Sequence, residues 1–194
     1  MLNETELKVL SSFFPEGNEI TLKMIIERTR LSYEPVYRTV KQLTYKKLVS
    51  VKKFGKISVY KIDFKKEEVK LAFFFYAKRK LKDFSEKHGT IFRALSKLNE
   101  ENVDFLAVFG SYAKGIERKN SDIDVLCVGS NKKDIERKVR GLRYETNLEF
   151  APVVILKSEF VNIKEENEVF WNDLIRFGII FKGYELFFYY TYLK

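Results

Sequence analysis

Residues 105–128 read FLAVFGSYAKGIERKNSDIDVLCV and carry the clearest structural signal in the chain. The pattern predicts a buried strand, a Gly110-Ser111 turn into a short helix, a polar loop and a second apolar strand that opens with two acids. Asp122 and Asp124 are two positions apart, so on a strand they share one face, with roots about 6.5–7 Å apart. Two acids on a rigid face can share a hard cation such as Mg²⁺ or Mn²⁺. Taken alone, Asp-x-Asp is also consistent with a solvated strand edge.

The Gly-Ser turn adds a feature that suits phosphate binding. Gly110 lets the backbone come close to a phosphate, and Ser111 and the N–H groups at the helix start supply donors. The combined pattern, Gly-Ser-x9-Ser-Asp-x-Asp between apolar strands, resembles the signature of the nucleotidyltransferase superfamily that includes DNA polymerase β. It is most similar to the minimal nucleotidyltransferase branch, whose usual Ala-Arg-Gly corresponds here to Ala113-Lys114-Gly115.

The resemblance implies a site in which Asp122 and Asp124 hold Mg²⁺ (or Mn²⁺) and a nucleoside triphosphate, with ATP as the expected nucleotide. Gly110 and Ser111 would cradle the phosphates. Lys114 would add positive charge near them, although a solvated lysine is an equal alternative.

The family also needs a third carboxylate on a neighbouring strand. Glu149, in the run NLEFAPVVIL at residues 147–156, is the acid best placed for it. The run resembles a strand of archaeal proteins in which a winged helix precedes a minimal nucleotidyltransferase. Two interpretations of Glu149 stay open, a metal ligand or general base and a solvated strand residue. Glu145 is the weaker substitute.

Residues 1–63 show a different pattern, three short helices followed by a hairpin around Gly55-Lys56. This order resembles the winged helix-turn-helix domain, in which the third helix enters the major groove and the wing grips the backbone. The resemblance implies a DNA-binding set of exposed residues: Tyr33, Arg38, Lys41, Gln42, Lys52, Lys53 and Lys56. The alternative is a structural module used for protein contacts.

The charge is divided unevenly along the chain, which supports two functions. Of the formal net charge of +9, residues 1–63 carry 12 basic and 7 acidic side chains, and residues 64–100 carry 10 and 5. Residues 101–194 carry 14 and 15. We therefore predict an α/β (α+β) protein with a winged helix at 1–63, a helical connector at 64–100 and a mixed-sheet nucleotidyltransferase domain at 101–194.

Composition excludes several other classes of protein. With one cysteine, Cys127, and one histidine, His88, the chain lacks the residues for a disulfide framework or a Cys/His metal site. The polar, acidic start is unlike a signal peptide, and the longest apolar run, near residues 71–77, is too short to span a bilayer. A cytoplasmic protein without a membrane partner is expected.

The predicted function is transfer of a nucleoside monophosphate from an NTP to a hydroxyl of a protein, an RNA or a small molecule. The alternative is a transcriptional regulator or toxin-antitoxin component with a nucleotide-sensing or inactive domain. Nucleic acid, a HEPN-type toxin and a second copy of the chain are the candidate partners.

Overall fold

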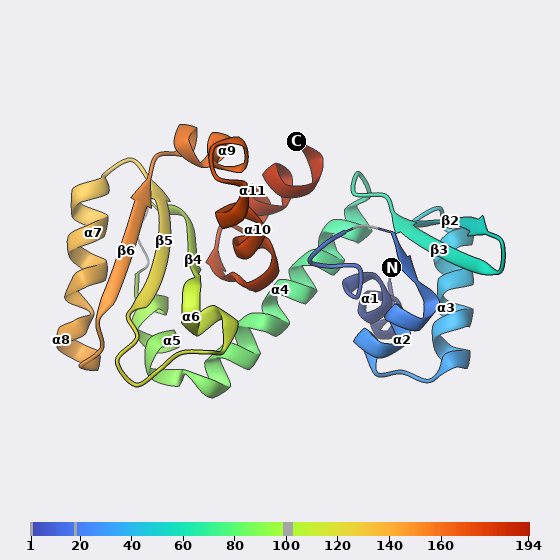
Figure 1. Ribbon diagram of the computed structural model, residues 1–194, viewed down its shortest axis with the longest axis horizontal. Helices are drawn as coiled ribbons and strands as arrows, with labels where there is room; N and C mark the ends of the chain where they lie inside the picture. The colour runs from blue at the N-terminus through green and yellow to red at the C-terminus, as the bar shows by residue number, and fades with distance from the viewer. Residues whose placement is uncertain (1, 18, 99–102) are drawn as a thin grey trace. The chain divides into compact units, whose positions relative to one another are not determined.

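The computed structural model describes residues 2–17, 19–98 and 103–194 (Figure 1). The chain divides into two compact units, residues 1–76 with 192–194 and residues 77–191. The division falls inside the segment predicted as a connector, and the predicted boundary at residues 100 and 101 lies outside the described residues. None of the helices in the described ranges is long and apolar enough to cross a membrane.

The first unit contains helices packed on a small antiparallel sheet. Its elements follow the order α1 (Glu4–Ser11), β1 (Ile20–Thr21), α2 (Leu22–Thr29), α3 (Tyr33–Tyr45), β2 (Val49–Phe54) and β3 (Ile57–Ile62). The strands are arranged β1-β3-β2. The predicted hairpin is confirmed: β2 and β3 pair from Val49↔Ile62 to Phe54↔Ile57, and Gly55 supplies the left-handed turn with φ +59°.

Apolar side chains at helical spacing form the interior of this unit. The buried residues from the three helices include Val9, Leu10, Ile25, Val36, Val40 and Leu43. On α3 they recur every three or four positions, which is the spacing of one face of a helix, so the opposite face of α3 is left at the surface.

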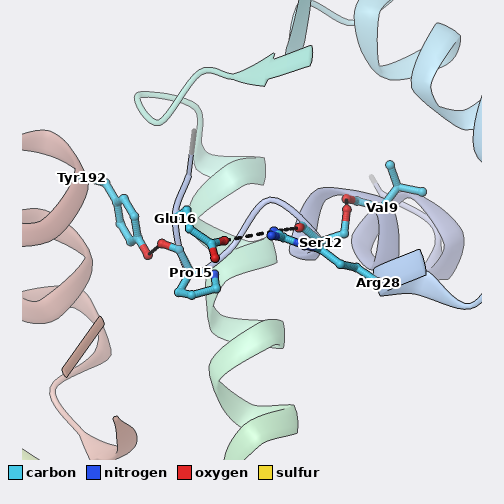
Figure 2. Close-up of polar contacts among 6 residues, drawn as sticks. All are labelled: Val9, Ser12, Pro15, Glu16, Arg28 and Tyr192. Carbon is cyan, nitrogen blue, oxygen red and sulfur yellow. Dashed lines mark hydrogen bonds and ion pairs between the residues drawn. The ribbon is translucent and has the colours of Figure 1, made fainter. Parts of the chain in front are cut away.

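The segment after α1 is fixed by polar contacts that Figure 2 shows. The guanidinium of Arg28 donates to the carbonyl oxygen of Ser12 at 2.9 Å and to Glu16 Oε2 at 3.0 Å. The hydroxyl of Tyr192, in the terminal π-helix Tyr189–Leu193, donates to the carbonyl oxygen of Pro15 at 2.6 Å. The Tyr192 ring also stacks on Phe64, with centroids 4.8 Å apart. Tyr192 thus packs within the first unit, although it lies near the end of the sequence.

The second unit is built on a four-stranded mixed sheet in the order β6-β5-β4-β7. Its strands are β4 (Val103–Val108), β5 (Ile123–Gly129), β6 (Phe150–Ile155) and β7 (Ile179–Lys182). β5 runs parallel to β6, whereas β4 is antiparallel to both β5 and β7.

Helices pack on both faces of this sheet. They are α4 (Glu67–Lys87), whose later part belongs to this unit, α5 (Gly89–Ser96), α6 (Gly110–Lys114), α7 (Lys132–Gly141), α8 (Arg143–Thr146), α9 (Lys157–Glu166), α10 (Glu168–Phe177) and α11 (Tyr184–Phe188). Figure 1 shows α7 on one side of the sheet and α10 and α11 on the other.

Strand alternation divides the residues of β5 between these two faces. Ile123, Val125 and Cys127 join a core cluster with residues of α5 and α7, and burial raises the pKa of the Cys127 thiol to about 12. On the opposite face, Phe105 of β4 contacts the rings of Phe160 and Phe187. Asp124 lies on this second face, because it alternates with the residues of the first.

Candidate functional sites

The Gly110–Ser111 turn lies directly against Asp124. Gly110 begins α6 with φ +67°, and a Cβ built on it would overlap a carboxylate oxygen of Asp124 and lie 2.8 Å from its Cγ. The backbone N–H of Phe109 donates to the carbonyl oxygen of Asp124 at 3.0 Å. Glycine is therefore required here for two reasons, the left-handed backbone and the closeness of the carboxylate.

Asp122 and Asp124 influence one another electrostatically. Asp122 is exposed just before β5, and Asp124 is half-buried within it. Burial, and secondly the charge of Asp122, raise the pKa of Asp124 above its ordinary value. Two carboxylates close together in a partly buried place repel one another, so Asp122 and Asp124 suit a divalent cation that would neutralise both charges.

Glu149 lies beside this pair along the backbone, but its side chain is exposed. Its carbonyl oxygen accepts from the N–H of Ile123 at 2.9 Å, one step before the parallel pair Ile123↔Phe150. The side chain is 66% exposed, with Oε1 3.9 Å from an Arg143 nitrogen. Ala151 is the residue paired with Asp124. Within the described residues, no three His, Cys, Asp or Glu side chains gather in a group that could hold a metal ion.

Lys114 has a partner that the sequence did not predict. Its Nζ lies 2.5 Å from Asp173 Oδ2 and 5.5 Å from the centroid of the Phe177 ring. Both partners are on α10, so the ion pair ties α6 to that helix. Asp173 is 59 positions away in the chain, and nothing local in the sequence indicates the pairing.

The loop between α6 and β5 is anchored by Glu117, whose role has no local signal in the sequence. Its Oε1 lies 3.0 Å from Lys87 Nζ and 3.6 Å from His88 Nε2. Burial lowers the pKa of His88, while the charge of Glu117 acts in the opposite direction. The anchor holds the segment that leads to Asp122 against the end of α4.

The residues predicted to contact DNA are found on two neighbouring elements of the first unit. Tyr33, Arg38, Lys41 and Gln42 are exposed on α3, and Lys52, Lys53 and Lys56 are exposed on the β2–β3 hairpin. Two of the cations have acidic neighbours: Arg38 Nε lies 2.6 Å from Glu34, and Lys52 Nζ lies 3.7 Å from Glu19. The set is therefore accessible, with part of its charge balanced locally.

Comparison with known proteins defines the class of the second unit. Residues 93–184 match the family model described as "Polymerase beta, Nucleotidyltransferase". This stretch is a polymerase beta-like nucleotidyltransferase domain, and it contains the turn and both aspartates described above.

A solved structure described as "Crystal structure of the toxin-antitoxin with AMP-PNP" is also similar to the chain. The two are 22% identical with a TM-score of 0.37, and the match covers 53% of this chain and 82% of that chain. No curated protein matches the chain.

Proposed function

We propose that this protein is a divalent-metal-dependent nucleotidyltransferase that transfers a nucleoside monophosphate from an NTP to an acceptor hydroxyl and releases pyrophosphate. The observation that carries the proposal is the close approach of Gly110 to Asp124, with the charge of Asp122 near enough to raise the pKa of Asp124. A phosphate-binding turn and two acids at one point of a rigid sheet are the parts that phosphoryl-type transfer needs.

Asp122 and Asp124 would hold Mg²⁺ or Mn²⁺, and Gly110 and Ser111 would contact the triphosphate, with ATP as the expected nucleotide. The raised pKa of Asp124 supports this fit, because a cation relieves the repulsion between the two acids. The bound metal would neutralise charge that develops on the transferred phosphoryl group. The peptide N–H groups at the start of α6 would orient the phosphates.

Glu149 remains the proposed third acid, as metal ligand or general base. Its backbone position next to Ile123 supports the assignment, since rotation of an exposed side chain costs little. Lys114 is proposed to approach the phosphates from its place beside Asp173, exchanging one anionic partner for another.

For the first unit we propose a winged helix that binds DNA. The order of helix, short strand, two helices and hairpin supports this, as does the basic excess of 12 over 7 in residues 1–63. The seven exposed residues on α3 and the hairpin would contact bases and phosphates. Such binding would weaken steeply with salt, because phosphate contacts release counterions.

The exposure of Glu149 favours a second candidate function, a nucleotide-sensing or inactive domain within a regulator or toxin-antitoxin component. Ala151, opposite Asp124, provides no carboxylate in its place. In this case the protein would bind NTP without transferring a nucleoside monophosphate from it. A HEPN-type toxin or a second copy of the chain would be the partner.

The test is incubation of the full-length protein with Mg²⁺ or Mn²⁺, each α-labelled NTP and a host-cell lysate, with label transfer and pyrophosphate both measured. We expect transfer that Asp124→Asn abolishes and that Asp104→Asn, at an exposed position of β4, leaves unchanged. NTP binding by calorimetry without transfer would favour the sensing function. If the protein shows neither NTP binding nor transfer, both candidate functions are overturned.

A further inference from the structure

One side of α3 carries three tyrosines and a lysine, and binding of duplex DNA alone does not require this many aromatic side chains. Tyr33, Tyr37, Lys41 and Tyr45 follow one another at intervals of four, so they form a continuous ridge along one side of the helix. Figure 1 shows α3 at the surface of the first unit. Tyr33 is 57% exposed and Tyr45 is 90% exposed. Large aromatic rings this accessible in a basic unit are candidate contact groups.

The first half of the ridge is already ordered. The rings of Tyr33 and Tyr37 stack, with centroids 5.6 Å apart and planes inclined by 13°. The Nζ of Lys41 lies 4.5 Å from the centroid of the Tyr37 ring. In contrast, no ring or cation contact of Tyr45 is found within the described residues. The Tyr45 ring is thus the member of the ridge whose faces remain available.

Tyr45 borders an open surface pocket of about 500 Å³ between α1 and α3. This volume lies within the range of about 300–1,000 Å³ that is usual for ligand pockets. The residues that line it are Asn3, Glu6, Lys41, Gln42, Tyr45 and Lys46. They provide one aromatic face, two amide side chains and two cations.

The floor of the pocket is held in place by a buried acid. Glu6 is 3% exposed; its Oε2 accepts from the N–H of Asn3 at 3.0 Å and its Oε1 from Lys46 Nζ at 2.6 Å. Burial raises the pKa of Glu6, but the hydrogen bonds from Lys46 and Asn3 outweigh this and lower it. Glu6 therefore stays ionised and fixes the Lys46 ammonium at the rim.

We propose that this pocket holds an unpaired base of a single-stranded nucleic acid, stacked on Tyr45, with the strand's phosphates beside Lys41 and Lys46. A base inside a duplex has both faces covered by its neighbours, so only an unpaired base can offer a face to Tyr45. The Gln42 amide can both donate to and accept from a base edge, whereas Asn3 offers its N–H donors, because its Oδ1 already accepts from the N–H of Glu6 at 2.9 Å. The inference rests on the proposal that the first unit binds nucleic acid, and it adds that the bound nucleic acid is single-stranded.

The test uses the full chain and three fluorescent probes: a 20-nucleotide oligo(dT), a 20-nucleotide oligo(U) and a mixed-sequence 20-base-pair DNA duplex. We expect anisotropy to show tighter binding of a single strand than of the duplex. The tighter of oligo(dT) and oligo(U) shows whether the site prefers a DNA or an RNA strand. Tyr45→Ala should weaken single-strand binding by about 5-fold or more, the loss of one stacking contact. Tyr45→Phe keeps the ring and should stay within about 2-fold of the unmodified protein.

Tyr144→Ala is the matched control, since Tyr144 is a 78% exposed tyrosine of the second unit. Both alanine variants change exposed side chains, so circular dichroism should show unchanged folding. If the duplex binds as tightly as the single strands, or if Tyr45→Ala has no effect on single-strand binding, the inference is wrong but nucleic-acid binding stands. If no probe binds, both the inference and the proposed binding function are overturned.

Discussion

Replacing Gly110 with alanine tests the close approach between the turn and the Asp124 carboxylate. An alanine at φ +67° adopts a left-handed conformation that costs about 1–2 kcal/mol. Its methyl group would also overlap the carboxylate of Asp124, whose Cγ is 2.8 Å from the new Cβ position. Overpacking of this kind costs a further ~1–3 kcal/mol. We therefore expect Gly110→Ala to lower the free energy of unfolding by about 2–5 kcal/mol.

Gly115→Ala provides a matched control in the same unit. Gly115 has φ +70°, so alanine meets the same backbone penalty, but its Cβ would contact only the flexible end of Lys87, at 3.7 Å. We expect a loss of about 1–2 kcal/mol for this variant. The difference between the two variants isolates the overlap with Asp124.

Urea denaturation followed by tryptophan fluorescence measures both values. The chain has one tryptophan, Trp171, which is 2% exposed inside the second unit, so its signal reports unfolding of that unit. If the turn serves catalysis, Gly110→Ala should also lower nucleotidyl transfer by about 100-fold, because Asp124 must move to make room. Equal stability and equal activity of the two alanine variants would refute the reasoning.

Three further predictions concern individual acids of the same domain. Burial and the neighbouring acid raise the pKa of Asp124 in the folded protein above the ordinary value of 3.8. The protonated carboxyl therefore stabilises the fold fully below pH 3.8, and this stabilisation is lost as the pH rises through the raised pKa. Asp124→Asn should therefore raise the urea midpoint of the metal-free protein at pH 7, and a lowered midpoint would contradict this. Glu149→Gln should reduce transfer by about 100-fold if Glu149 is the general base, with the urea midpoint unchanged; an unchanged rate would remove it from the mechanism. Asp173→Asn should release Lys114 and lower the Kd for NTP a few-fold by calorimetry, whereas Asp104→Asn should not.

The local features of the second unit could be predicted from its sequence. The strand, turn, helix, loop and strand of residues 105–128 are all present, because apolar runs and a glycine with positive φ are encoded within a few residues of one another. The mixed α/β fold with its sheets is confirmed on the same basis. Of the two predicted aspartates, Asp124 lies in β5, whereas Asp122 lies just before the strand, near enough for its charge to raise the pKa of Asp124.

The long-range partners could not be predicted in this way. The ion pair between Lys114 and Asp173 depends on how α10 packs beside α6, and the position of Glu149 depends on the register of β6 against β5. A shift of one residue in that register would turn every side chain of β6 to the other face. The sequence of one strand does not determine this register, because it is set by both strands and by the helices that cover them.

The arrangement of β5 links the stability of the second unit to the ligand that we propose. The same strand places Ile123 and Val125 in the core and Asp124 on the opposite face, so Asp124 cannot turn toward solvent without disturbing the core. Its partial burial beside Asp122 is unfavourable in the metal-free protein, as the raised pKa indicates. A cation bound by both acids would remove this cost in the folded state only, and stability should then rise with cation concentration. Mg²⁺ should accordingly raise the urea midpoint of the unmodified protein and leave that of Asp124→Asn unchanged, and an equal effect on both would mean that the cation binds elsewhere.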